Sequence, residues 1–324
     1  MRDILKEIQE KLDEIEQKEH VKILHAVESG SRSWGFASPD SDYDVRFVYV
    51  RPMEAYLSIE EPKDVIEWQL DEVLDINGWD IKKALKLFAK GNATLFEWSG
   101  SPVVYRTTPE WERIREVSKQ YFSEKTAVCH YYGTANSTYM EYLQGERVRY
   151  KKYFYALRPL LAAEYIERYH EAPPVLFDDL LKLELPETFR NALDELLEIK
   201  KRTTEKEENP QMPVIKAFIE EELKKQKEIG DALPNDHNRN LEALNQIFRE
   251  LLEGSAKKNR PLWQIKHIFD GDFGCEERPA GQAELMVSVT LVNETGEERY
   301  ETVSDAWLRE NGLDVGSTWL HHVE

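Results

Sequence analysis

Three aspartates stand at alternate positions near the end of the stretch Glu28–Arg46, ESGSRSWGFASPDSDYDVR. Asp40, Asp42 and Asp44 lead into DVRFVYV, a run of β-branched and aromatic residues that is typical of a strand. Side chains two residues apart on a strand point the same way, so Asp42 and Asp44 share one face. Carboxylates that close repel each other unless a cation lies between them. Magnesium is suited to such oxygen ligands, because it keeps coordination positions for a substrate phosphate.

The three aspartates also resemble two common loop motifs. Their spacing imitates the start of a calcium-binding EF-hand loop, whose sixth residue is Gly and whose twelfth is Glu. Val45 and Arg51 occupy those positions here, so an EF-hand is excluded. Taken alone, the aspartates favour an Asp-rich turn that merely caps the strand over a metal site.

The Gly30-Ser31 pair upstream favours the metal site. It follows VKILHAV, residues 21–27, which predicts a buried strand. Gly30 lets the backbone approach a phosphate closely, and Ser31 supplies a hydroxyl group. The residues SRSWGFA, 31–37, predict a short turn or helix, whose first N–H groups are free to bind an anion. Phosphate and cation would thus meet at one place.

The elements around these residues predict a small α/β core with a mixed sheet flanked by helices. An opening helix is indicated by an apolar stripe at helical spacing, formed by Ile4, Ile8, Leu12 and Ile15. Strands are expected at 21–27 and 43–50, with further strand material within 65–78. A helix should follow at 81–91, with Asp80 as its N-cap and its end near Gly91.

The residue pattern changes twice in the remainder of the chain. Residues 108–255 are largely helical in pattern, including a long segment at 145–171 that Pro159 should kink and a polar loop at 203–213. Residues 284–303 predict a β-hairpin, followed by a short helix at 304–311. We therefore expect an α+β protein with three domains. These are a catalytic core at 1–107, a helical domain at 108–258 and a small β-rich module at 259–324.

Composition limits the possible functions. The 324 residues carry a net charge of −19, which argues against coating nucleic acid by charge alone but leaves room for a local basic groove. The two cysteines, Cys129 and Cys275, indicate a reducing compartment. The N-terminus does not resemble a signal peptide, and no apolar run is long enough for a membrane span. We expect a soluble, cytoplasmic protein without membrane contact.

Basic residues are concentrated in residues 145–158. Arg147, Lys151 and Arg158 are four and seven residues apart, so a helix would place them near one face, together with Tyr155, which could stack on a base. The alternative is a solvated basic face paired with nearby acids. Two further arginines, Arg32 and Arg46, flank the aspartates and either bind a phosphate or offset the acidic charge. The aromatic residues of SRSWGF, Trp34 and Phe36, are expected in the core rather than in a nucleotide pocket.

The pattern Gly30-Ser31, ten residues, then Asp42-x-Asp44 resembles the hallmark of the polymerase-β-like nucleotidyltransferase superfamily. Longer stretches resemble one branch of it, the YcgL-type, RNA-ligase-associated predicted nucleotidyltransferases. They are HAVESGSRSWGFASPDSDYDVRFVYV, DINGWDIKKALKLFAKGNATLFEWSGSPVVY and YKKYFYALRPLLAAEYIE. The resemblance covers about residues 20–250 and does not extend to the module after 260.

This resemblance implies transfer of a nucleoside monophosphate from an NTP, with ATP as the expected donor, to an acceptor hydroxyl, with release of pyrophosphate. It implies Mg²⁺ or Mn²⁺ held by Asp42, Asp44 and a third carboxylate on a neighbouring strand. Asp75 is the expected third carboxylate, and Asp80 is the alternative because it also suits a helix cap. The implied nucleotide-binding residues are Gly30, Ser31, Arg32, Lys151, Lys152 and Arg158.

The sequence leaves the acceptor open. The branch and the aromatic-basic helix point to RNA processing, at a tRNA or other RNA end. Transfer of AMP to a protein, as in antitoxin-type nucleotidyltransferases, is a second possibility. A non-catalytic regulatory module that only binds nucleotide is a third, and the intact Gly30-Ser31 pair with Asp42 and Asp44 speaks against it.

Overall fold

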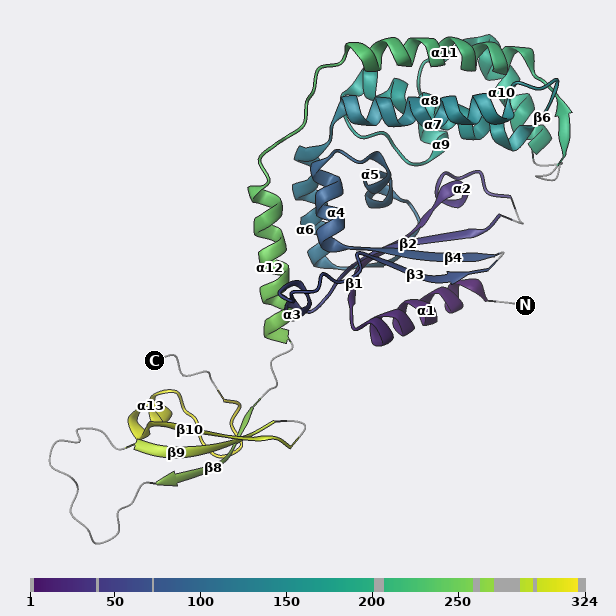
Figure 1. The fold of residues 1–324 in the computed structure, drawn as a ribbon. Helices are drawn as coiled ribbons and strands as arrows, with labels where there is room; N and C mark the ends of the chain where they lie inside the picture. The colour runs from purple at the N-terminus through teal and green to yellow at the C-terminus, as the bar shows by residue number, and fades with distance from the viewer. Residues whose placement is uncertain are drawn as a thin grey trace, which may run out of the picture. The chain divides into compact units, whose positions relative to one another are not determined.

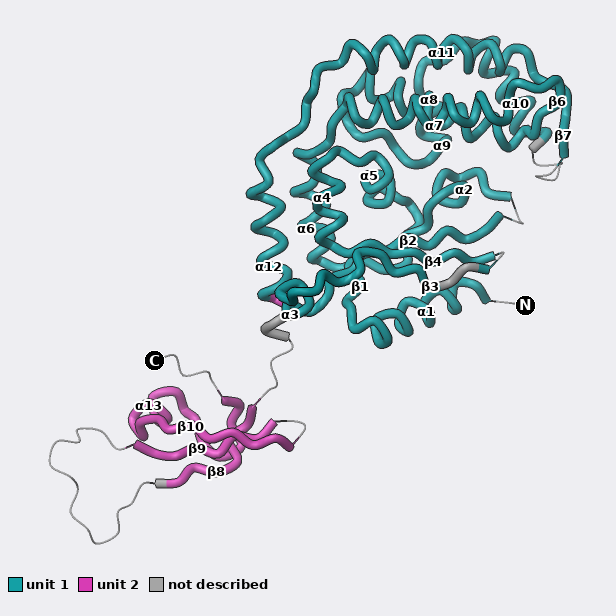
Figure 2. The backbone as a smooth tube through the Cα atoms, viewed as in Figure 1, with its two compact units in different colours: residues 1–253 teal, residues 254–324 magenta. Residues whose placement is uncertain are grey.

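The structure is a computed structural model that describes residues 3–38, 41–71, 73–200, 207–258, 263–270, 286–293 and 296–319. Asp40 and Cys275 lie outside the described residues. The chain divides into two compact units, residues 1–253 and 254–324, which Figure 2 distinguishes by colour. Among the described residues, no helix has both the length and the apolar character needed to cross a membrane.

A mixed five-stranded sheet forms the centre of the first unit, in the order β3-β4-β2-β1-β5. The strands are β1 Lys22–Ser29, β2 Tyr43–Val50, β3 Val65–Leu70, β4 Leu74–Asp80 and β5 Val104–Thr107. β2 and β4 run parallel, whereas the other neighbouring pairs are antiparallel. The predicted α+β fold with a mixed sheet is therefore confirmed.

Helices cover both faces of this sheet (Figure 1). They are α1 Ile4–Glu19 on one face, and α4 Ile81–Ala89, α5 Ala93–Gly100 and α6 Pro109–Ser118 on the other. Short helices follow β1 and β2, namely α2 Gly30–Ser33 and α3 Met53–Tyr56. The apolar stripe of α1 packs on the sheet through Ile8, Leu12 and Ile15, none of which is exposed. α12, Glu242–Lys258, joins the core on the α4 side.

A second hydrophobic core lies among the helices between residues 124 and 232. These helices are α7 Glu124–Tyr142, α8 Tyr150–Tyr169, α9 Phe177–Leu180, α10 Glu187–Lys200 and α11 Pro213–Ala232, with the 3₁₀ turn η1 Lys119–Tyr121 before them. Phe36 enters this core from the segment after α2 and contacts Phe154 and Phe177, with ring centroids 5.3 and 5.6 Å away. The core position predicted for Phe36 is confirmed, whereas Trp34 is half-buried.

One basic segment departs from the prediction. Residues 147–149 are not helical but form β6, Arg147–Arg149, which pairs with β7, Glu208–Pro210, inside the expected polar loop. Val148 is 2% exposed and belongs to the core among these helices, so the strand pairing and this burial together override the helical pattern of the flanking residues. α8 begins at Tyr150 and continues through Pro159. The prediction that Arg147 shares a helix face with Lys151 is therefore wrong.

The second unit contains the antiparallel sheet β10-β9-β8. Its elements are β8 Gln264–Asp270, β9 Met286–Val292, β10 Glu298–Ser304 and α13 Asp305–Glu310. The hairpin and short helix expected from the sequence are confirmed, and β8 is an additional strand. Val287, Val289 and Leu291 alternate along β9 and are buried in the unit's own small core.

Candidate active site

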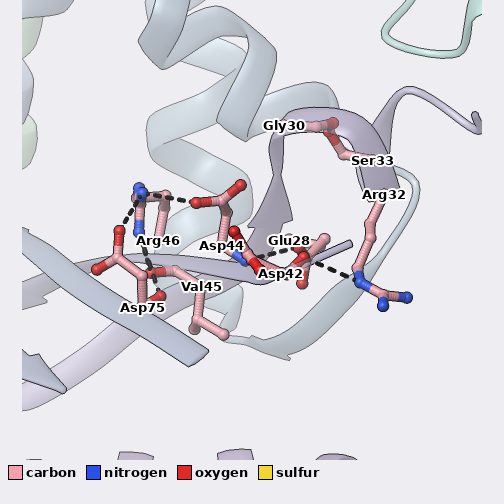
Figure 3. A network of polar contacts seen from close by, with 9 residues as sticks. All are labelled: Glu28, Gly30, Arg32, Ser33, Asp42, Asp44, Val45, Arg46 and Asp75. Carbon is pink, nitrogen blue, oxygen red and sulfur yellow. Dashed lines mark hydrogen bonds and ion pairs between the residues drawn. The ribbon is translucent and has the colours of Figure 1, made fainter. Parts of the chain in front are cut away.

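Strand register brings the predicted carboxylates together at one end of the sheet (Figure 3). Asp44 on β2 is paired with Ser29 on antiparallel β1 and with Asp75 on parallel β4. The end of β1, which leads into Gly30, therefore lies on one side of Asp44 and Asp75 lies on the other. Asp42, just before β2, is exposed and close enough for its charge to affect the Asp44 carboxyl.

Gly30 faces Asp44 directly. Its φ of +64° lies in the left-handed region, and a Cβ added there would stand 2.6 Å from Asp44 Oδ2. Only glycine meets both conditions, because any other residue would be strained and would also displace the carboxylate. The turn is closed by Ser33 Oγ, which donates to the Gly30 carbonyl at 2.8 Å. Ser31, the other half of the predicted pair, is buried at 7% exposure.

Glu28 is a site residue that sequence reasoning missed. Its carboxylate accepts the backbone N–H of Asp44 at 2.8 Å and the hydroxyl of Tyr105, while Ser101 Oγ donates to its carbonyl at 2.7 Å. Glu28 is 1% exposed, and burial raises the pKa of its carboxyl. The available signal was a carboxylate at the end of an otherwise apolar strand, two residues before Gly30.

Arg46 joins the two paired aspartates. Its Nη2 donates to Asp75 Oδ2 at 2.7 Å and to Asp44 Oδ1 at 3.1 Å, and its Nη1 donates to the Asp75 carbonyl at 3.2 Å. Asp44 and Arg46 are two residues apart on β2, so they share one face of the strand. Of the two roles predicted for Arg46, the structure shows charge compensation of the aspartates.

Nearby positive charge is needed to keep the Asp44 carboxyl ionised. Burial raises the pKa of the Asp44 carboxyl, and the charges of Asp75 and Asp42 raise it further, whereas Arg46 and Lys151 lower it. The ionised form of this half-buried carboxyl is thus supported by two protein cations. A third cation at Asp42 and Asp44 would act in the same direction.

The arginine beside the turn holds the loop before β2. Arg32 Nη2 donates to the Ser41 carbonyl at 2.6 Å, and its Nε donates to the Asp42 carbonyl at 3.0 Å. Its guanidinium also lies over the ring of Tyr43, 3.7 Å from the centroid. Arg32 thereby ties the backbone of Asp42 to α2, and its predicted contact with nucleotide stays a prediction.

Two predicted lysines lie in the first turn of α8. Lys152 Nζ is 3.6 Å from the ring centroid of Tyr142, and Lys151 Nζ is 5.7 Å from that of Tyr155. Burial lowers the pKa of Lys152. Tyr155 in turn meets Trp34 edge to face, with centroids 5.5 Å apart. The start of α8 is therefore packed against the segment that follows α2.

Arg158 lies deeper in the molecule than the other predicted nucleotide-binding residues. It is 2% exposed and forms an ion pair with Glu97 of α5. Its guanidinium carbon is 4.9 Å from the ring centroid of Trp34 and 5.8 Å from that of Tyr131. Arg158 thus packs against the ring of Trp34, and Glu97 compensates its charge.

The alternative third carboxylate, Asp80, lies at the opposite end of β4 from Asp75. It pairs in register with Tyr49, and it caps α4 by accepting the Lys82 N–H at 2.8 Å. Its second oxygen accepts the hydroxyl of Tyr56 at 2.8 Å. With both oxygens in use at the far end, Asp80 acts as the helix cap, and Asp75 is the carboxylate beside Asp44.

The donors at this site fit a hard divalent cation in part. Asp42 and Asp44 offer the carboxylate oxygens that Mg²⁺ and Mn²⁺ prefer, and Gly30 lets its backbone pack directly against the Asp44 carboxylate. In the part of the chain that the structure describes, no three His, Cys, Asp or Glu side chains converge to hold a metal. Arg46 bonds Asp75 more closely, at 2.7 Å, than Asp44, at 3.1 Å, and the second oxygen of Asp44 faces Gly30, so Asp42 and Asp44 are the residues that would hold the ion.

Comparison with known proteins agrees with the geometry. Residues 4–250 match the family RlaP, described as an RNA repair pathway DNA polymerase beta family. The uncharacterized protein YcgL of Bacillus subtilis (strain 168) is 41% identical over 246 residues, which cover 75% of this chain and 95% of that protein. The resemblance predicted from the sequence is thereby confirmed. The chain belongs to the RNA repair pathway DNA polymerase beta family.

Proposed function

We propose that this protein is a metal-dependent nucleotidyltransferase that moves a nucleoside monophosphate from an NTP, with ATP as donor, to a hydroxyl at an RNA end. The family supports nucleotidyl transfer as the type of reaction. The observation that carries the proposal is the packing of Gly30 against Asp44, with Asp75 in register beside it. This arrangement combines a close backbone approach for phosphate with carboxylates for a cation.

In the proposed reaction, the acceptor oxygen forms a bond to the α-phosphorus as the bond from that phosphorus to the bridging oxygen breaks, and pyrophosphate leaves. Mg²⁺ held by Asp42 and Asp44 would supply Lewis-acid stabilisation of the charge on the phosphates. The N–H groups after Gly30 bind phosphate oxygens, and Lys151 and Lys152 offset the charge of the pyrophosphate. Asp75, oriented by its hydrogen bonds to Arg46, receives the proton of the acceptor hydroxyl.

The test is transfer of label from each α-labelled NTP, with Mg²⁺, to purified tRNA, to total RNA or to the proteins of a cell lysate. We expect label on RNA with the wild type and none with Asp44→Asn. Asp231→Asn is the matched control, because Asp231 is an exposed aspartate on α11, far along the chain from the site. Label on a protein instead would favour AMP transfer to protein. Binding of NTP without transfer to any polymer would favour a regulatory module.

A further inference from the structure

A groove of about 590 Å³ lies between α4 and α12, both of which pack in the core of the first unit. Its floor is apolar and includes Leu85, Leu244 and the ring of Phe248. Its rim is basic, with Lys82 and Lys86 from α4, Lys90 at the C-cap of α4 and Arg239 from the segment before α12. The function proposed above uses none of these residues.

The lysines of the rim are evenly spaced. Lys82 and Lys86 lie on α4 and Lys90 is its C-cap, each four residues after the last, so they follow one side of the helix about 6 Å apart along its axis. A row of point charges at regular intervals suits a ligand whose negative charges also recur regularly, as the phosphates of a polynucleotide do.

The charge of the rim is largely uncompensated. Lys82 has Glu61 at 3.9 Å, but no ion pair is found for Lys86, Lys90 or Arg239 among the residues that the structure describes. All three are exposed. The residues that line the groove include these four cations and no acidic side chain, in a chain whose net charge is −19. The groove therefore concentrates positive charge on an otherwise acidic protein, which favours an anionic ligand at this place.

The wall opposite α4 is anchored to the rest of the unit. Asp236 accepts the Ser123 hydroxyl at 2.5 Å and the Glu124 N–H at 2.7 Å. One ring nitrogen of His237 lies 3.1 Å from the carbonyl of Lys90, at the end of α4 itself. These hydrogen bonds fix the segment before α12 relative to α4 and α7, so the two walls of the groove are held in place by the fold.

We infer that this groove binds single-stranded RNA, with phosphates on Lys86, Lys90 and Arg239 and base faces on the apolar floor around Phe248. The choice of RNA rests on the proposed function, whereas the anionic, repeating character of the ligand rests on the groove. Bases bind apolar and aromatic surfaces through their faces without regard to sequence, so the groove would hold many RNAs.

The groove also requires a ligand of some length. Asp80, the N-cap of α4, is the fifth residue after Asp75 along β4, which corresponds to about 17 Å of strand. A nucleotide at Gly30 and Asp44 would not reach Lys86. A polynucleotide could place its end at the carboxylates and its body in the groove. Loss of the groove should therefore raise the KM for an RNA acceptor and leave the KM for NTP unchanged.

The test is fluorescence anisotropy of a labelled single-stranded RNA of about 20 nucleotides, without NTP. The variant Lys86→Gln/Lys90→Gln is compared with Lys224→Gln/Lys227→Gln, which removes the same charge from exposed positions of α11. Each lost phosphate contact should lower the salt slope by about 0.7 and the affinity at 0.1 M salt by about fivefold. We expect the groove variant to bind about 25-fold more weakly than wild type and with a slope about 1.4 smaller.

Equal loss in the groove and control variants, or no loss in either, would overturn the inference. A labelled poly-glutamate peptide serves as the competing ligand. If it binds in a manner that depends on Lys86 and Lys90 and the RNA does not, the groove receives an acidic protein and the inference is wrong. RNA binding without NTP and transfer of label are measured separately, so a protein that binds RNA through Lys86 and Lys90 but transfers no label would refute the proposed catalysis and not the groove.

Discussion

Replacement of Gly30 by alanine tests the geometry on which the candidate site depends. The new Cβ would stand 2.6 Å from Asp44 Oδ2, against the 3.4 Å or more of an ordinary contact. Asp44 is the flexible partner, so we expect its carboxylate to rotate away while the fold survives. The left-handed φ adds a cost of about 1–2 kcal/mol to the free energy of folding.

A displacement of nearly 1 Å at a reacting group lowers a rate by about 100-fold. We therefore expect Gly30→Ala to lose about two orders of magnitude in nucleotidyl transfer and to lose affinity for Mn²⁺, measured by electron paramagnetic resonance. The free energy of unfolding in urea should fall by only about 1–2 kcal/mol.

Gly312→Ala is the matched control. Gly312 has φ +62°, but a Cβ there would meet nothing within 4 Å. That variant carries the same backbone strain without touching a carboxylate, so transfer and Mn²⁺ affinity should match the wild type. If Gly30→Ala also kept the wild-type rate and Mn²⁺ affinity, the proposed role of the Gly30–Asp44 contact would be refuted.

Charged groups in the site and the core give three further predictions. Burial raises the pKa of Glu28, so the folded state is most stable with this carboxyl protonated and loses stability as pH rises through the raised pKa. Glu28→Gln should therefore be more stable than wild type at pH 8 but not at pH 4, measured by urea unfolding. Arg158→Met leaves the half-buried Glu97 without its cation and should cost about 3 kcal/mol in thermal or urea unfolding, largely restored by adding Glu97→Gln. Asp75→Asn should abolish transfer with little change in stability, whereas Asp80→Ala should lose a helix cap worth about 0.5–2 kcal/mol and retain transfer; the reverse pattern would exchange their roles.

The cations around Asp44 show how the site tolerates its acidic charge. Arg46 hydrogen-bonds both Asp44 and Asp75, and Lys151 contributes from α8. Because Arg46 bonds Asp75 at 2.7 Å and Asp44 at 3.1 Å, an ion at this site would rely on Asp42 and the second oxygen of Asp44 unless Arg46 moved. The number of Mn²⁺ ions bound per chain, in wild type and in Arg46→Gln, would show whether the guanidinium takes the place of a second metal.

Local patterns predicted those elements whose cause is local. The strand at 43–50 and the helix after Asp80 agree with the structure because β-branched residues and a capping carboxylate act within a few residues. The pattern failed at Arg147–Arg149, where pairing with residues about 60 positions later stabilises a strand. No signal within the segment itself reports such a distant partner.

The sequence by itself determined that Asp42 and Asp44 precede and enter one strand after a glycine turn, because the pleat of a strand and the freedom of glycine are local properties. It left Asp75 and Asp80 as alternatives, and it did not show Glu28 or the bridge made by Arg46. Only the tertiary structure decided these points. Parallel pairing of β2 with β4 sets which carboxylate lies beside Asp44. Burial, which depends on contacts between segments far apart in the chain, sets which charged groups pair with one another and which remain exposed.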